Sequence, residues 1–186
     1  MVGPVARAAG LTGVIVSDEV DASTAHGIGF ADIRMGRRHF DTDAAPEAAY
    51  GFLPGTRPVL SLEAEVVAVK HVPAGAGVSY GYTFRTARPT TLALIGLGYS
   101  DGVPRLASNR AQVLVNGIRR PLVGRIAMDQ LVVDCGDDQP TTGDIATLFG
   151  DPDHGAPPAT DWAEWTERSP LDLTAGLGVR IARRPR

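Results

Sequence analysis

The chain has 186 residues, of which 44% are hydrophobic and 21% are charged, values that are ordinary for a globular protein. A formal net charge of −3 gives no reason to expect nucleic acid or an anionic membrane as a partner, and no run of about 18 apolar residues predicts a membrane span. The single cysteine, Cys135, excludes an internal disulfide. Since no signal segment opens the sequence, we expect a cytoplasmic protein.

The first 54 residues differ in character from the rest. Two short apolar runs, at 13–17 and 31–36, predict buried strands, and residues 1–10 are compatible with a helix despite Pro4. We therefore predict a short α/β segment over residues 1–54, followed by a separate domain over residues 55–186.

From residue 62 onward the pattern predicts β-structure. Residues 62–72 alternate apolar and polar side chains, as a half-buried strand requires. Asn116-Gly117 predicts a type I′ hairpin turn, because both residues tolerate positive φ. Strands this short and this regularly spaced predict a mainly β fold, a small antiparallel barrel or sandwich. The other expected strands are 90–97, 111–115, 118–123, 131–135 and 145–149.

Within residues 55–186, helix is predicted only near the end of the chain. Thr160 is a suitable N-cap for a helix over 160–165, which Ser169-Pro170 would end. Residues 151–159 form a loop rich in proline and glycine. The acidic residues and the histidine of this loop stand beside prolines, so we interpret them as solvated and expect no metal site.

Four motifs stand out in the predicted β-domain. They are Ser79-Tyr80-Gly81, Gly98-Tyr99-Ser100-Asp101-Gly102-Val103-Pro104-Arg105, Asn116-Gly117, and Pro121-Leu122-Val123-Gly124-Arg125-Ile126-Ala127-Met128-Asp129-Gln130. In order and spacing these motifs resemble the C-terminal β-domain of alanine racemase, an enzyme that depends on pyridoxal phosphate. Looser similarity extends from about residue 60 to the end of the chain. The resemblance implies a barrel-like β-domain.

The resemblance implies a catalytic role for Tyr80. A tyrosine at this position takes the α-proton from one face of the alanine–cofactor adduct, while a lysine of the barrel domain works from the other face. A tyrosine acts as a base only where nearby positive charge favours its phenolate form. The alternative reading is an exposed tyrosine in a glycine-flanked turn. Tyr82 stands where the family often has a small residue, so it is a candidate to crowd Tyr80.

The resemblance also assigns residues to the contact with substrate. An arginine fork suits an incoming carboxylate because it donates two parallel hydrogen bonds. For Arg125 an ion pair with Asp101 or Asp129 is an equally good reading, and a methionine in a strand is commonly core filling. The residues implied to bind substrate are Tyr99, Arg105, Arg125, Met128 and Asp129.

The candidate cofactor-binding residues lie in the N-terminal segment. In the family, an eight-stranded β/α barrel that holds the cofactor precedes the β-domain. Residues 33–36 resemble the closing motif of that barrel, which makes Arg34 and Gly36 candidates for cofactor binding. Met35 replaces a proline of the motif, and the polar run 37–39 replaces apolar residues. Two interpretations therefore remain, a remnant of the barrel or an unrelated N-terminal extension.

Lys70 is the only lysine of the chain and lies in a predicted strand. A pyridoxal phosphate enzyme needs a lysine amine to form its Schiff base. We therefore expect the chain to be inactive alone, so that pyridoxal phosphate enters the site only on a barrel from another chain. Val179 stands where some racemases have a tyrosine that touches the cofactor phosphate.

The expected partners are such a barrel protein or further copies of the chain. The alternatives are a non-catalytic binding or structural module and a truncated relic of a racemase. The sequence leaves open whether the chain is an enzyme and which amino acid it would handle.

Overall fold

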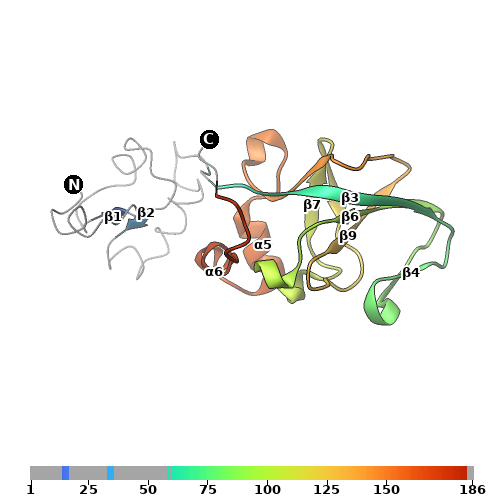
Figure 1. The fold of residues 1–186 in the computed structure, drawn as a ribbon, viewed down its shortest axis with the longest axis horizontal. Helices are drawn as coiled ribbons and strands as arrows, with labels where there is room; N and C mark the ends of the chain where they lie inside the picture. The colour runs from blue at the N-terminus through green and yellow to red at the C-terminus, as the bar shows by residue number, and fades with distance from the viewer. Residues whose placement is uncertain (1–13, 17–32, 36–57, 59, 184–186) are drawn as a thin grey trace. The chain divides into compact units, whose positions relative to one another are not determined.

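The computed structural model describes residues 14–16, 33–35, 58 and 60–183. The chain divides into two units, residues 1–60 and 61–186 (Figure 1). In the first unit, β1 (Val14–Val16) and β2 (Ile33–Met35) pair as parallel strands. The two predicted strands are confirmed. Their side chains, Gly36 and the expected helix at 1–10 lie outside the described residues.

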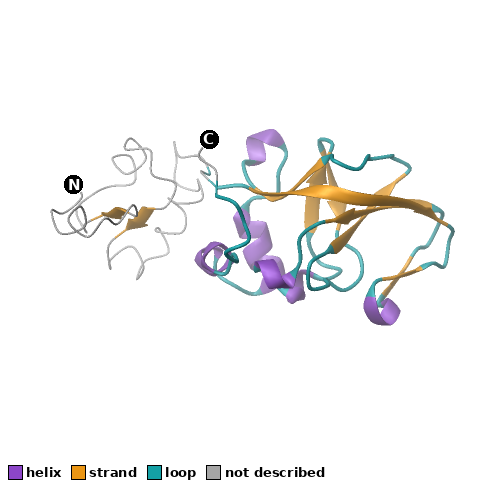
Figure 2. Ribbon diagram, viewed as in Figure 1, coloured by secondary structure: helices purple, strands orange, loops and turns teal. Residues whose placement is uncertain are grey.

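The second unit is built on six antiparallel strands in the order β8-β7-β10-β3-β6-β9 (Figures 1 and 2). A bridge between Leu122 and Val133, together with a 2.9 Å bond from the Val123 N–H to the Val132 carbonyl, nearly closes the sheet. The predicted small antiparallel barrel is therefore confirmed. Its strands are β3 (Leu62–Val72), β6 (Thr90–Ile95), β7 (Gln112–Val115), β8 (Ile118–Pro121), β9 (Leu131–Gly136) and β10 (Ile145–Phe149).

Alternating side chains give the barrel its core. In β9, Leu131, Val133 and Cys135 are buried, and the residues between them are half-buried. In β3 the alternation is broken by a bulge after Val66, which leaves Val67 exposed. Each fully buried aliphatic side chain stabilises the fold by about 1.5–3 kcal/mol. Burial also raises the pKa of the Cys135 thiol, so this cysteine behaves as a core residue.

One hairpin lies within the six-stranded sheet, and a second forms a two-stranded sheet of its own. Asn116 and Gly117 have φ values of 50° and 77°, which confirms the predicted turn between β7 and β8. The second hairpin pairs β4 (Gly77–Val78) with β5 (Phe84–Arg85) and carries the 3₁₀ turn η1 (Tyr80–Tyr82). Figure 1 shows this hairpin, in green, standing away from the barrel. Residues 77–85 are called the tyrosine arm below.

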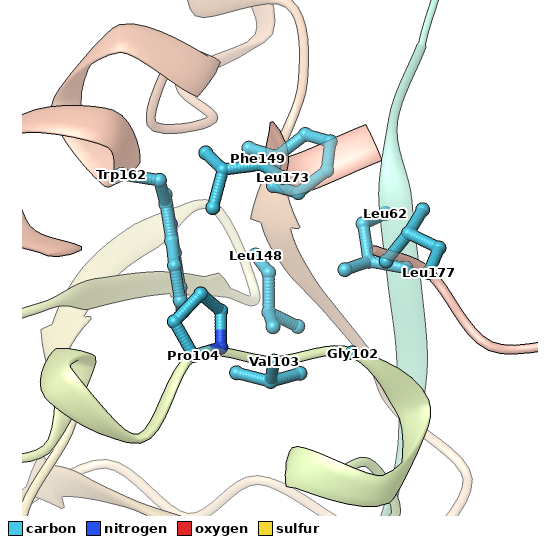
Figure 3. A pocket seen from close by; sticks show the side chains of 9 residues that line it. All are labelled: Leu62, Gly102, Val103, Pro104, Leu148, Phe149, Trp162, Leu173 and Leu177. Carbon is cyan, nitrogen blue, oxygen red and sulfur yellow. The ribbon is translucent and has the colours of Figure 1, made fainter. Parts of the chain in front are cut away.

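Two helices cover one end of the barrel (Figure 2). The first, α5, spans Ala159–Thr166 with Pro158 as its N-cap. The expectation that Thr160 caps this helix is wrong: the proline already holds the extended backbone that precedes a helix, so Thr160 lies in the first turn. The buried Trp162 of α5 packs beside Leu148 and Pro104 around a small apolar cavity (Figure 3).

The expectation that Ser169-Pro170 ends the first helix is also wrong. Helix α5 ends at Thr166, and its C-cap Glu167 has a left-handed φ of 53°. Ser169 instead begins α6 (Pro170–Ala175): its hydroxyl accepts the Asp172 N–H at 3.1 Å, and the Asp172 carboxylate accepts the Ser169 N–H at 3.3 Å. This capping box, with proline in the first turn, is a start signal for a helix.

Three further 3₁₀ turns complete the described elements: η2 (Tyr99–Asp101), η3 (Arg105–Ala107) and η4 (Pro152–His154). The last lies in the predicted loop 151–159 and begins where Asp151 accepts the Asp153 N–H at 3.0 Å. Within the part of the chain that the structure describes, no helix has the length and apolar character needed to cross a bilayer.

Candidate functional site

Tyr80 stands at the tip of the tyrosine arm with 70% of its surface exposed. The turn around it has an unusual backbone, since Ser79, Gly81 and Tyr82 have φ values of 57°, 71° and 47°. Left-handed backbone at a residue other than glycine costs about 1–2 kcal/mol. Such strain persists only where surrounding contacts hold it. The arm therefore presents Tyr80 outward in a fixed conformation.

Arg125 supplies the contacts that hold this turn. The Ser79 hydroxyl donates to the Arg125 carbonyl oxygen at 2.6 Å. The Arg125 guanidinium lies against Gly81, where an added Cβ would stand 3.4 Å from Nη1. Among the described residues, no carboxylate lies within ion-pair distance of this guanidinium. The alternative pairing with Asp101 or Asp129 is wrong for this structure, because both bind Arg180 instead.

The ring of Tyr82 packs onto its own hairpin. It lies against the backbone of Gly77, where a Cβ would collide with it, and the Arg85 guanidinium stacks over the ring at 5.5 Å from its centroid. Cation–π stacking of this kind is worth about 0.5–1 kcal/mol at an exposed site. The contacts of Tyr82 thus strengthen the arm.

Tyr99 and Arg105 form a second exposed pair. They belong to the consecutive turns η2 and η3, and the Arg105 guanidinium stacks over the Tyr99 ring at 5.3 Å from its centroid. The described residues place no carboxylate within 4 Å of the Arg105 guanidinium. Stacking leaves the edge of a guanidinium free to donate hydrogen bonds, so this arginine can receive a carboxylate.

Met128 and Asp129 lie on the segment beside Tyr99. Met128 is 54% exposed, and so is the side chain of Asp129. The Asp129 carboxylate accepts hydrogen bonds from Arg180 Nη2 at 2.6 Å and from the Ser100 hydroxyl at 2.9 Å. The hydrogen bond from Arg180, and then the one from Ser100, lowers the pKa of Asp129. This carboxylate is thus engaged within the protein.

Arg180 is the site residue that the sequence analysis missed. It binds Asp129 and also the buried Asp101, at 2.9 Å. Two carboxylates in glycine-rich motifs do indicate a cation partner, but the sequence offers Arg125 four residues away from Asp129. Nothing in the run around Arg180 distinguishes it from the other arginines near the end of the chain.

One loop, residues 122–130, connects these groups. It places Arg125 under the tyrosine arm and Met128 beside Tyr99, whose N–H donates to the Ala127 carbonyl at 3.0 Å. The structure therefore brings Tyr80 together with Arg125, and Tyr99 together with Arg105, Met128 and Asp129. Arg34 belongs to the other unit, which is described by itself.

Known proteins resemble this chain closely. The family model for the alanine racemase C-terminal domain matches residues 59–185. Alanine racemase of Salinispora arenicola is 52% identical over 132 residues, which cover 68% of this chain and 36% of that protein. The crystal structure of alanine racemase from D-cycloserine-producing Streptomyces lavendulae has a TM-score of 0.71 at 43% identity, covering 81% of this chain and 40% of that one.

A third relative is known with its cofactor. The crystal structure of Bartonella henselae alanine racemase with covalently bound pyridoxal phosphate has a TM-score of 0.68 at 34% identity. It covers 82% of this chain and 41% of that one. The chain thus spans about 40% of the length of the relatives that it matches. It belongs to the alanine racemase family, whose C-terminal domain residues 59–185 form.

Proposed function

We propose that this domain completes the site of an alanine racemase whose cofactor-bearing barrel is a separate polypeptide, and that it is inactive alone. In this proposal Tyr80 takes and returns the proton at the α-carbon of alanine. The observation that carries the proposal is the presentation of Tyr80: it is exposed at the tip of a strained arm that Arg125 holds from below. A buried or loosely held tyrosine would not serve a site that faces another chain.

The described residues do not fit pyridoxal phosphate by themselves. Lys70, the sole lysine, is exposed on β3 opposite Leu92, whereas Tyr80 lies on the separate tyrosine arm. The small cavity beside Trp162 has an apolar lining without a charged residue (Figure 3). A phosphate-bearing aldehyde needs an amine and an anion site in one enclosed place. The proposal therefore assigns the cofactor to the other polypeptide.

Arg105 and Arg125 are the proposed contacts of the alanine carboxylate. Both are exposed: Arg105 stacks over Tyr99, and Arg125 lies against the turn that carries Tyr80. Neither has a carboxylate partner among the described residues. An arginine fork binds a carboxylate through two parallel hydrogen bonds. The exposed Met128 side chain would then contact the apolar part of the ligand. Asp129 has a structural role in this proposal, because Arg180 already engages it.

We also propose that the N-terminal unit is the end of the family's β/α barrel. Strands β1 and β2 are parallel and are separated by residues 17–32, long enough for the crossover that parallel strands require. Residues 61–186 are about two thirds of the chain, so an alignment that covers 82% of it extends into the first unit. Arg34 would then lie on a barrel strand, at the position for which the resemblance implies cofactor binding.

The proposal is tested by mixing two polypeptides. The full chain is combined with pyridoxal phosphate and with the barrel part of Streptomyces coelicolor alanine racemase, and exchange of the alanine α-proton is followed in D₂O. We expect no exchange with this chain alone and measurable exchange with the mixture. Tyr80→Phe should lower the rate by at least about 100-fold. Tyr82→Phe is the matched control and should leave the rate close to that of the unsubstituted chain.

Two outcomes would contradict the proposal. The first is racemisation by this chain without the barrel polypeptide. The second is an inactive mixture when the same barrel is active with its own C-terminal domain. In the second case, a non-catalytic binding module becomes the better reading. Val179, which is 98% exposed, stands where only some racemases have a tyrosine, so it does not decide between the two readings.

A further inference from the structure

We infer that Arg180 is a positioning residue: from the C-terminal segment, its guanidinium fixes the two loops that present Tyr99 and Met128. The contacts of Arg180 hold whether or not the domain takes part in catalysis. Only the use of Tyr99 and Met128 in a racemase site rests on the proposed function. Neither the family match nor the motifs assign a role to this arginine.

Asp101 is the first anchor of this arrangement. Its side chain is only 7% exposed, and one carboxylate oxygen accepts the Gly98 N–H at 3.0 Å. The other oxygen accepts the Arg180 Nε–H at 3.1 Å, and the Nη2 atom of Arg180 lies 2.9 Å from this same oxygen. A buried carboxylate is unfavourable unless a cation and hydrogen-bond donors satisfy it. Arg180 is the cation that allows Asp101 to close the turn η2.

Asp129 is the second anchor, and it lies on a different loop. Arg180 Nη2 donates to the Asp129 carboxylate at 2.6 Å and also to the Ser100 hydroxyl. That hydroxyl lies 2.8 Å from the Met128 carbonyl oxygen and 2.9 Å from the Asp129 carboxylate. One guanidinium therefore joins η2 to the Met128-Asp129 segment. The lowered pKa of Asp129 is consistent with this pairing.

The backbones of the three segments interlock around this guanidinium. The Gly178 N–H donates to the Asp101 carbonyl at 2.8 Å, and the Ser100 N–H donates to the Met128 carbonyl at 2.9 Å. Gly98 and Gly102 pack so closely that an added Cβ would overlap backbone atoms of Met128 and of residue 176, respectively. Tyr99 and Met128 therefore cannot move independently while Arg180 holds the segments together.

Side-chain resonances of the full chain report this positioning directly. The sequence has three methionines and four tyrosines, so methyl-¹³C methionine and 3-fluorotyrosine each give a few resolved signals. In Arg180→Met we expect the Met128 and Tyr99 signals to shift and the Ser100 amide to exchange at least about tenfold faster. The Tyr80 and Tyr82 signals should stay in place, because the tyrosine arm is held by Arg125. Arg180→Lys keeps the positive charge but cannot donate in the forked geometry of a guanidinium. In that variant we expect the Met128 and Tyr99 signals to shift less than in Arg180→Met.

The matched control is Arg88→Met, which removes an exposed arginine paired with Asp137 at 3.0 Å. It should leave the Met128 and Tyr99 signals unchanged. If Arg180→Met does not fold, Asp129→Asn replaces it: that variant leaves the Asp101 pair intact and should shift Met128 while Tyr99 moves less. Unchanged Met128 and Tyr99 signals in a folded Arg180→Met or Asp129→Asn variant would overturn the inference. Since no readout depends on racemisation, this failure is distinct from failure of the proposed function.

Discussion

The tyrosine arm and the loops that carry Tyr99 and Met128 extend from the same barrel, but different forces hold them. The arm depends on a strained backbone held by one hydroxyl–carbonyl bond and by side-chain packing. The Tyr99 and Met128 loops depend on closely packed glycines and on carboxylates that share the Arg180 guanidinium. The first arrangement should respond to backbone substitutions and be nearly independent of pH. The second should respond to packing and to the ionisation of its carboxylates.

The largest effect is expected at Gly98, where the loops pack most tightly. Its φ of −146° is accessible to any residue, so only the collision of a new Cβ with the Met128 carbonyl opposes a substitution. Gly98→Ala should lower the free energy of unfolding by about 3 kcal/mol or more, measured by urea denaturation. Gly117→Ala is the control. An added Cβ at Gly117 would meet no atom, but the φ of 77° disfavours alanine, so this substitution should lower the free energy of unfolding by about 1 kcal/mol. Equal losses at the two sites would contradict the packing argument.

The next effect concerns the buried carboxylate. Asp101→Asn keeps the shape of the side chain but removes the charge that faces Arg180, so we expect a loss of about 2–3 kcal/mol in the free energy of unfolding. Asp137→Asn removes the exposed partner of Arg88 and should change that free energy by less than about 1 kcal/mol. A loss at Asp101 no larger than that at Asp137 would show that the network contributes little to stability.

The sequence predicts the barrel well for a physical reason. Alternation of side chains, the Asn116-Gly117 turn and flanking glycines are local features, and they decide strand positions such as Leu62–Val72 and Ile145–Phe149. The error at Thr160 is a shift of a helix start by two residues, because Pro158 rather than Thr160 is the N-cap. The error at Ser169 is of another kind: a helix start signal was interpreted as a helix end.

The candidate site is predicted less completely because it depends on contacts between distant residues. Tyr80 and Tyr99 are found from motifs, yet the partner of Asp101 lies 79 residues away in the chain. No periodicity or local motif marks such a pair. The resemblance assigns Asp129 to substrate binding, and that role stays a prediction. Its pairing with Arg180 is a second distant contact that no local pattern predicts.

In the tyrosine arm, two substitutions at Ser79 separate the contribution of backbone strain to stability from that of the hydrogen bond. Ser79→Ala loses the bond to the Arg125 carbonyl and keeps the left-handed backbone, so we expect a loss of about 1 kcal/mol. Ser79→Gly loses the same bond but relieves the strain, so its free energy of unfolding should lie close to that of the unsubstituted chain. Urea denaturation of both variants measures the difference. If Ser79→Gly were the less stable variant, strain would not be a feature of this turn.

The smallest effect is the pH dependence that distinguishes the two regions. Arg180 and Ser100 lower the pKa of Asp129. A carboxyl group whose pKa is lower in the folded state stabilises the fold above its unfolded pKa, about 3.9, and this contribution is lost as the pH falls through the folded value. The urea midpoint of the unsubstituted chain should therefore exceed that of Asp129→Asn at pH 6, and the difference should disappear as the pH falls below about 4.

The Arg180→Met background tests the cause of this pH dependence. The difference at pH 6 should shrink there, because the largest contribution to the lowered pKa comes from Arg180. Asp144 serves as the control, since its pKa is lowered by Thr141 and Asn116, which carry no charge. The effect of Asp144→Asn should be the same with and without Arg180. If the Asp129 difference also survives in Arg180→Met, then Ser100 alone sets the ionisation of Asp129, and the two regions are less distinct than their contacts indicate.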